Sequence, residues 1–235
     1  MTNTVSKKGV GQMFDAIAHR YDFLNHFLSL GADVYWRRVA VRKLMIEPTS
    51  VVLDCATGTC DCAIAASKYS PRKIVGIDIS INMLRYGKEK LERKSLSTID
   101  LVDASIEHPA FRTEYFDRAI VAFGVRNFLD LGKGLGQIHG VMKPGGRFVV
   151  LEFSKPRRFP MKQIYFFYFR RILPLIGRFI SNNKNAYSYL PASVMEFPEG
   201  EAFAAKLTEA GFNNVTSQRL TFGIVTIYTA VKTVS

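Results

Sequence analysis

The segment Asp54-Cys-Ala-Thr-Gly-Thr-Cys-Asp61 directly follows the apolar run of residues 50–53. That run is short enough for a buried strand, and the Ala-rich stretch 61–68 after the turn favours a helix. Gly58 lacks a Cβ at the point where the turn brings the backbone close to a ligand. A strand, a tight turn and a helix in this order are typical of an open α/β sheet, whose ligands lie beyond the carboxyl ends of the strands.

The same design recurs along the chain. Four further apolar runs, separated by helical stretches, predict a buried parallel sheet, and they cover residues 73–78, 98–103, 117–122 and 147–153. The last two runs, 214–220 and 224–231, are joined by a connection too short for a crossover helix, so they pair antiparallel. We therefore expect an α/β, Rossmann-like fold with a seven-stranded, mostly parallel sheet and a C-terminal antiparallel hairpin.

The helical stretches fit a single domain, residues 1–235. Ser80 is suited to cap the helix that begins after it, and Lys143-Pro-Gly-Gly146 ends the glycine-rich helix 131–142. We expect residues 1–46 to form an N-terminal helical extension. Residues 157–200 are expected to form a helical insertion, or lid, that covers a substrate.

The formal net charge is +12 over 235 residues, which suits a nucleic acid, an acidic membrane surface or simply a basic soluble protein. The polar N-terminus is unlike a signal peptide, and no apolar run is long enough to span a bilayer as a helix. The three cysteines are crowded into residues 55–62, which indicates a reducing compartment and hence a cytoplasmic protein. No histidine lies near them in sequence, so we expect them to pack around the turn and expect no metal.

An acidic residue ends each of the first three strands: Asp54, Asp78 and Asp103. Asp78 can accept both hydroxyls of a ribose, and Asp103, with Ala104 beside it, can accept from an adenine amine. Thr59 and the helix N-terminus that follows suit the carboxylate of a methionine moiety. A dinucleotide needs G-x-G-x-x-G, whereas this loop has one glycine. The pattern predicts S-adenosylmethionine, and the alternative is that the acids only cap the strand ends.

Longer motifs lie outside this loop, namely Met13-Phe-Asp-Ala-Ile-Ala-His-Arg-Tyr-Asp22, Phe123-Gly-Val-Arg-Asn127, Lys143-Pro-Gly-Gly-Arg147 and Leu151-Glu-Phe-Ser-Lys-Pro156. With them the sequence resembles, over nearly its whole length, the C-methyltransferases of menaquinone and ubiquinone biosynthesis. The resemblance implies methyl transfer from S-adenosylmethionine to a ring carbon of a polyprenylated demethylmenaquinol. It also implies a set of cofactor contacts: Thr59, Asp78, Asp103 and Ala104.

The implied chemistry needs an activated ring. A ring carbon attacks the sulfonium methyl group far more readily once an adjacent phenol ionises, and such a phenol has a pKa of about 10. Arg126, in the loop after the fourth strand, is our candidate for the cation that favours the phenolate, with Asn127 orienting a water or a quinol oxygen. The alternative for Arg126 is an ordinary ion pair in the loop. Candidates for the base are Tyr21, Asp22, Tyr189 and His108.

Two departures from the family bear on the cofactor. Cys60 stands where the family places glycine, so it narrows the loop or shifts its backbone. The segment 105–109 replaces an acidic residue and Leu-Pro-Phe, which concerns the adenine contact. The non-enzymatic alternative is therefore an inactive scaffold that binds cofactor or lipid.

The segment Ile164-Tyr-Phe-Phe-Tyr-Phe-Arg-Arg171 is aromatic and basic. As an interfacial helix it would hold the polyprenyl tail and meet lipid phosphates, and as a core helix it would extend its arginines to water. We expect transient contact with the inner face of the membrane.

Two rival substrates belong to other classes. A benzoquinol shares all of these motifs, so it stays open. A basic RNA methyltransferase that modifies amino groups carries an Asp/Asn-Pro-Pro-aromatic turn after the fourth strand, where this chain has Phe123-Gly-Val-Arg126. We therefore expect no nucleic-acid partner, and the sequence carries no indication of the oligomeric state.

Overall fold

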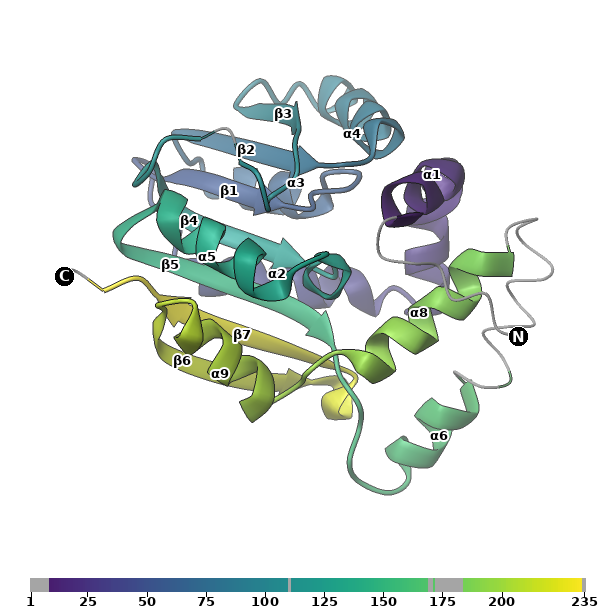
Figure 1. The fold of residues 1–235 in the computed structure, drawn as a ribbon. Helices are drawn as coiled ribbons and strands as arrows, with labels where there is room; N and C mark the ends of the chain where they lie inside the picture. The colour runs from purple at the N-terminus through teal and green to yellow at the C-terminus, as the bar shows by residue number, and fades with distance from the viewer. Residues whose placement is uncertain (1–8, 110, 169–170, 172–183, 234–235) are drawn as a thin grey trace.

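The protein folds into a seven-stranded sheet with helices on both faces (Figure 1). The computed structural model describes residues 9–109, 111–168, 171 and 184–233. The strands are β1 Val51–Cys55, β2 Lys73–Asp78, β3 Ile99–Asp103, β4 Phe116–Ala122, β5 Met142–Phe153, β6 Asn213–Leu220 and β7 Val225–Val231. Their order in the sheet is β3-β2-β1-β4-β5-β7-β6.

The first five strands run parallel, as their unbroken apolar runs predicted. β1 lies between β2 and β4, with Leu53 opposite both Val75 and Ala119, and every residue of β1 is buried. A strand buried on both faces needs apolar side chains at successive positions. β7 runs antiparallel to both β5 and β6, so the predicted C-terminal hairpin and the α/β fold are confirmed.

The described helices are α1 Val10–Leu28, α2 Ala32–Lys43, α3 Asp61–Ser67, α4 Ile81–Arg93, α5 Leu131–Val141, α6 Met161–Phe167, α8 Lys184–Glu196 and α9 Glu201–Glu209, with the 3-10 turns η2 Val125–Asn127 and η4 Thr221–Gly223. Neighbouring side chains of a strand point to opposite faces of the sheet. Leu53 belongs to the core formed with α5 and α9, whereas Val52 belongs to the core formed with α2 and α3. The sheet is therefore covered on both sides.

The described residues of the predicted N-terminal helical extension form two helices, α1 and α2. Gly31 lies between them with φ +78°, a conformation that glycine adopts without a steric penalty. Trp36 and Val39 of α2 are buried in the core beside Val52, so α2 is part of the layer that covers the sheet. α1, α6 and α8 lie beyond the carboxyl ends of the strands (Figure 1).

The aromatic, basic segment begins in α6, which buries Tyr165 and exposes Ile164 and Phe167. Phe169 and Arg170 lie outside the described residues. None of the helices in the described part of the chain is long and apolar enough to cross a membrane.

Glycines in α5 serve different purposes at different positions. A Cβ built on Gly134 would lie 2.5 Å from Cδ2 of Phe128, whereas one on Gly136 meets nothing within 4 Å. Phe128 is buried at the end of the loop after β4. Gly134 thus lets α5 approach that loop, and Gly136 has no such role.

We predict opposite effects for two alanine substitutions in α5. Gly136→Ala should raise the free energy of unfolding by up to about 1 kcal/mol, because alanine favours the helix. Gly134→Ala should lower it by about 1–3 kcal/mol, because the methyl group overpacks against Phe128. Urea denaturation of the two variants measures both values, and stabilisation by Gly134→Ala would contradict the packing described.

Candidate active site

A pocket of about 230 Å³ opens at the carboxyl edge of the sheet. Its walls come from the loop after β1, the ends of β2 and β3, the loop after β4, and helix α1. The lining residues include Phe14, Tyr21, Gly58, Asp78, Met83, Ala104, Glu107 and Asn127. This is the edge at which the acid-terminated strands predicted a ligand.

Asp54 shapes the loop from beneath and does not line the pocket. Its Oδ2 accepts hydrogen bonds from Thr57 Oγ1 (2.6 Å) and from the backbone N–H of Ala63 (3.0 Å). Burial raises the pKa of this carboxyl to about 7, while Oδ1 has no hydrogen-bond partner among the described residues. Asp54 therefore holds the turn and the start of α3 together.

Gly58 and Asp78 form the part of the pocket that best fits the predicted cofactor. Gly58 has φ +56°, and a Cβ there would find only Tyr21 Cε1, at 3.9 Å, so the space above it is open. Its N–H donates to Asp78 Oδ2 (2.8 Å), while Oδ1 of Asp78 accepts from Ser80 N–H (2.9 Å). Burial raises the pKa of Asp78. The carboxylate of Asp78 is a hydrogen-bond acceptor at the end of β2, and Gly58 beside it leaves space for a ligand. This arrangement suits a ribose.

Ala104 and Asp103 differ in their placement. Ala104 lines the pocket together with Met83, which gives an apolar wall for a flat ring. The Asp103 side chain is exposed and is absent from the pocket lining. Of the two residues predicted for the adenine contact, the structure brings only Ala104 to the pocket.

Cys60 does not narrow the pocket. Its backbone is left-handed (φ +69°), and its side chain is fully buried. A Cβ added to Gly87 of α4 would lie 2.3 Å from Cys60 Sγ, so the thiol occupies the space that Gly87 leaves. This contact could not be predicted from the sequence pattern, because Cys60 precedes α3 and Gly87 lies on α4.

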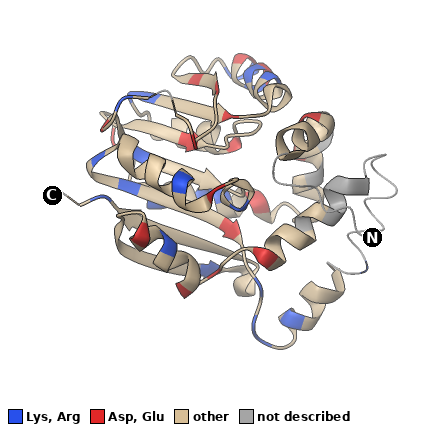
Figure 2. Ribbon diagram, in the orientation of Figure 1, with Lys and Arg blue, Asp and Glu red and all other residues tan. Residues whose placement is uncertain are grey.

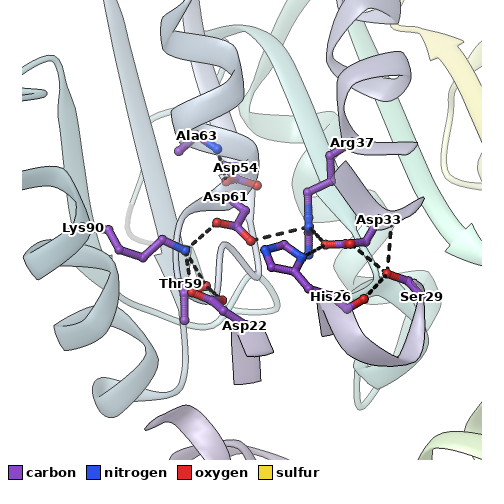
Figure 3. Close-up of polar contacts among 10 residues, drawn as sticks. All are labelled: Asp22, His26, Ser29, Asp33, Arg37, Asp54, Thr59, Asp61, Ala63 and Lys90. Atoms are coloured by element: carbon purple, nitrogen blue, oxygen red, sulfur yellow. Dashed lines mark hydrogen bonds and ion pairs between the residues drawn. The ribbon is translucent and has the colours of Figure 1, made fainter. Parts of the chain in front are cut away.

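Thr59 and Asp22 contact each other instead of the pocket (Figure 3). Thr59 Oγ1 donates to Asp22 Oδ1 (2.5 Å). Lys90 Nζ of α4 donates to Asp22 Oδ2 (2.8 Å) and to Asp61 Oδ1 (2.5 Å). Both carboxylate oxygens of Asp22 are thus engaged outside the pocket, so Asp22 acts here as a link between α1 and the loop.

The same network continues into α2 (Figure 3). Arg37 pairs with Asp33 on its own helix and with Asp61 Oδ2 (3.5 Å). His26 Nδ1 of α1 lies 2.7 Å from Asp33 Oδ2. These contacts tie α1, which lines the pocket, to the loop that forms its floor.

Tyr21 faces the pocket beside Gly58. Burial raises the pKa of its phenol, so it is a neutral hydrogen-bond donor near pH 7. This position suits a residue that contacts a bound molecule. The raised pKa disfavours the role of general base for which Tyr21 was a candidate.

Arg126 is a buried ion-pair partner and does not line the pocket. Its Nη1 donates to Glu152 Oε1 (2.7 Å) and to the carbonyl oxygen of Phe123 (2.5 Å), and its Nε donates to Ser193 Oγ (3.3 Å). Glu152, on β5, is fully buried, and burial raises its pKa while Arg126 opposes that rise. The ion-pair alternative for Arg126 is therefore the arrangement observed.

Asn127, the next residue, does line the pocket. Its Oδ1 accepts a hydrogen bond from Tyr189 Oη of α8 (2.9 Å), and burial raises the pKa of Tyr189. His108 is exposed, with Nε2 at 2.9 Å from Lys133 Nζ, and is not among the lining residues. Of the four base candidates, Tyr21 lines the pocket, while Tyr189 contacts Asn127 in its wall.

Glu107 is a pocket residue that the sequence analysis missed. It is buried, and its Oε1 accepts from the backbone N–H groups of Leu129 (2.5 Å) and Asp130 (3.3 Å). Glu107 lies in the segment 105–109 that departs from the family pattern. A carboxylate so close to the carboxyl end of β3 could have predicted a residue of the pocket.

Comparison with known proteins decides the family. The model of the ubiE/COQ5 methyltransferase family matches residues 1–232. The chain belongs to this family. A Bacteroides fragilis protein named demethylmenaquinone methyltransferase is 44% identical over 225 residues, which cover 95% of this chain and 92% of that protein. A Geotalea daltonii protein named ubiquinone/menaquinone biosynthesis C-methyltransferase UbiE is 46% identical, over 97% of this chain and 99% of that protein.

Solved structures support the fold. The cyclase SpnF matches with a TM-score of 0.72 at 15% identity, over 99% of this chain and 97% of that chain. A SAM-dependent methyltransferase from Aquifex aeolicus matches with a TM-score of 0.61 at 16% identity, over 84% and 89% of the two chains. Family and fold together confirm the predicted class, a methyltransferase that uses S-adenosylmethionine.

We predict that Cys60 and Gly87 are coupled. Gly87→Ala alone should destabilise the protein by about 1–3 kcal/mol, because the new methyl group overlaps Cys60 Sγ. Combined with Cys60→Gly, which removes the thiol and suits the left-handed backbone, most of that loss should be recovered. Urea denaturation of the two single variants and the double variant measures the coupling, and simple additivity of the two effects would contradict the contact.

Proposed function

We propose that this methyltransferase transfers a methyl group from S-adenosylmethionine to a ring carbon of a polyprenylated demethylmenaquinol, which gives menaquinol. The names of the relatives support this, since the Bacteroides fragilis protein is a demethylmenaquinone methyltransferase. The observation that carries the proposal is the placement of Asn127 in the pocket wall, with its side chain held by Tyr189. The Geotalea daltonii name, which includes ubiquinone, supports a benzoquinol as the alternative ring.

We propose that the cofactor lies over Gly58, with Asp78 accepting from its ribose and Ala104 and Met83 beside its adenine. S-adenosylmethionine supplies an electrophilic methyl group on a sulfonium centre. The open space above Gly58 and the half-buried carboxylate of Asp78 support this position. Asp54 and Thr59 would then act through the loop, because their side chains are held by Ala63 and Asp22.

On the substrate side, Asn127 and Tyr21 are the proposed contacts of the quinol. Because Asn127 Oδ1 is taken by Tyr189, its amide nitrogen is the end that can donate to a quinol oxygen or to an ordered water. Tyr21, a neutral phenol, can donate as well. Donors aimed at a developing phenolate oxygen lower the energy of the transition state. Arg126 supports this arrangement as a positioning residue, since it anchors the loop to Glu152.

We propose that the whole chain is one methyltransferase domain, with residues 157–200 covering the substrate. The polyprenyl tail of the substrate requires access to a bilayer, so we propose a cytoplasmic protein that meets the inner face of the membrane transiently. The chain's net charge of +12 supports this, because anionic lipids attract basic surfaces.

The experiment that tests the function is incubation of the protein with methyl-labelled S-adenosylmethionine and demethylated naphthoquinols and benzoquinols. We expect incorporation of label into the naphthoquinol and none into the corresponding oxidised quinone, because the quinone lacks the phenol that activates the ring carbon. Total RNA serves as the competing acceptor. Transfer to RNA and to neither quinol would overturn the proposal, and binding of cofactor with no transfer to any acceptor would favour the inactive scaffold.

A further inference from the structure

The three most exposed large apolar side chains among the described residues belong to one end of the molecule. They are Leu30 (92% exposed), Phe159 (81%) and Phe222 (77%). Leu30 lies in the turn after α1, Phe159 precedes α6, and Phe222 lies in η4. All three elements are found at the carboxyl edge of the sheet, where the pocket opens (Figure 1).

Hydrogen bonds show that these elements adjoin one another. Tyr168, just after α6, donates from Oη to the carbonyl oxygen of Leu28 at the end of α1 (3.2 Å). Trp36 Nε1 of α2 donates to Thr221 Oγ1 of η4 (2.7 Å). Ser154, in the segment that leads to α6, donates to the carbonyl oxygen of Gly223 (2.9 Å). The elements that carry the exposed side chains are therefore neighbours at this edge of the sheet.

Helix α6 adds an apolar stripe to this surface. Ile164 and Phe167 are both exposed and lie three residues apart, so they share one side of the helix. Tyr165 faces the opposite way and packs with Val194 of α8. We call the set Leu30, Phe159, Ile164, Phe167 and Phe222 the docking face.

The surroundings of the docking face are basic. Between Glu152 and Glu196 the sequence contains no Asp or Glu and eight Lys or Arg residues. Figure 2 shows Lys and Arg but no Asp or Glu on α6 and on the segment that leads to it. Arg158 and Lys162 are exposed and form no ion pair within the described part of the chain. A partner that covers this face must accept apolar side chains and carry negative charge.

We propose that the docking face is the surface by which the protein binds an anionic phospholipid bilayer. Aromatic and aliphatic side chains enter the headgroup boundary, while Arg158, Lys162 and Arg171 meet lipid phosphates. The orientation brings the carboxyl edge of the sheet, and with it the pocket, toward the lipid that dissolves a polyprenylated substrate. The position of the docking face follows from the exposed residues, whereas its role in substrate access rests on the proposed function.

The backbone offers variants that spare the fold. Leu30 and Phe222 both have positive φ (52° and 56°), a region that asparagine tolerates better than leucine or phenylalanine. Leu30→Asn/Phe222→Asn therefore removes two apolar side chains without adding strain. Met45→Asn is the matched control, because Met45 is also exposed (61%) with φ 52°. It lies at the opposite edge of the sheet, where its carbonyl oxygen accepts from Arg118 Nε.

The test is co-sedimentation of the full chain with vesicles of phosphatidylcholine alone or mixed with phosphatidylglycerol. We expect the wild type and Met45→Asn to bind the mixed vesicles, and the double variant to bind them about tenfold more weakly at an unchanged melting temperature. Equal vesicle binding by the double variant and the wild type would overturn the proposal. A wild type that binds no vesicles but forms a dimer, which the double substitution dissociates, would also overturn it.

Turnover separates this proposal from the function. The double variant should methylate a water-soluble short-chain quinol as fast as the wild type, yet be slower with a quinol carried in mixed vesicles. Loss of turnover on vesicles by Met45→Asn as well would count against the docking face. If neither the wild type nor any variant methylates any quinol, the proposed function is rejected. The co-sedimentation experiment still tests the docking face in that case.

Discussion

The buried ion pair between Arg126 and Glu152 is the constraint on which the pocket wall that contains Asn127 depends. Glu152 is fully enclosed on β5, and an enclosed carboxylate is stable only when it is paired. Arg126 supplies the pair and also binds the carbonyl oxygen of Phe123 and the hydroxyl of Ser193. One guanidinium thus joins the central sheet, the loop after β4 and helix α8. Removing either partner leaves an uncompensated charge, at a cost of about 3–5 kcal/mol, so the loop that carries Asn127 is held in one arrangement.

The cofactor side follows the same logic with charges that are less deeply buried. Lys90 and Arg37 share the carboxylates of Asp22, Asp33 and Asp61, which belong to α1, α2 and the start of α3 (Figure 3). Because α1 supplies Phe14 and Tyr21 to the pocket, this network determines where one pocket wall stands. The two halves of the site are therefore placed by ion pairs that never touch the pocket, while the pocket itself is lined mainly by apolar groups, backbone and a few polar ends.

The sequence predicted the parts of this structure that depend on local pattern. Apolar runs predicted the strands, and their acid ends predicted the edge at which the pocket lies, because parallel strands end together. The sequence pattern did not predict the direction in which individual side chains point. Thr59 turns to Asp22, and Arg126 turns to Glu152, since each finds a partner that is distant in sequence. Cys60 looked like a defect of the loop because the glycine that accommodates it, Gly87, lies on another helix. Likewise, the sequence predicted a helical N-terminal extension but not the turn at Leu30 and Gly31 that divides it into α1 and α2.

The central claim is that the Arg126–Glu152 pair positions the loop after β4, whose Asn127 we propose as a substrate contact. Its most direct test compares Arg126→Met, Glu152→Leu and the double variant in stability, turnover and binding of S-adenosylhomocysteine. The account predicts that each single variant is strongly destabilised and that the double variant regains stability, because no buried charge is left unpaired. Turnover of the double variant should nevertheless stay low, with cofactor binding close to that of the wild type, since Asn127 is no longer held. A double variant that regains both stability and wild-type turnover would contradict the account.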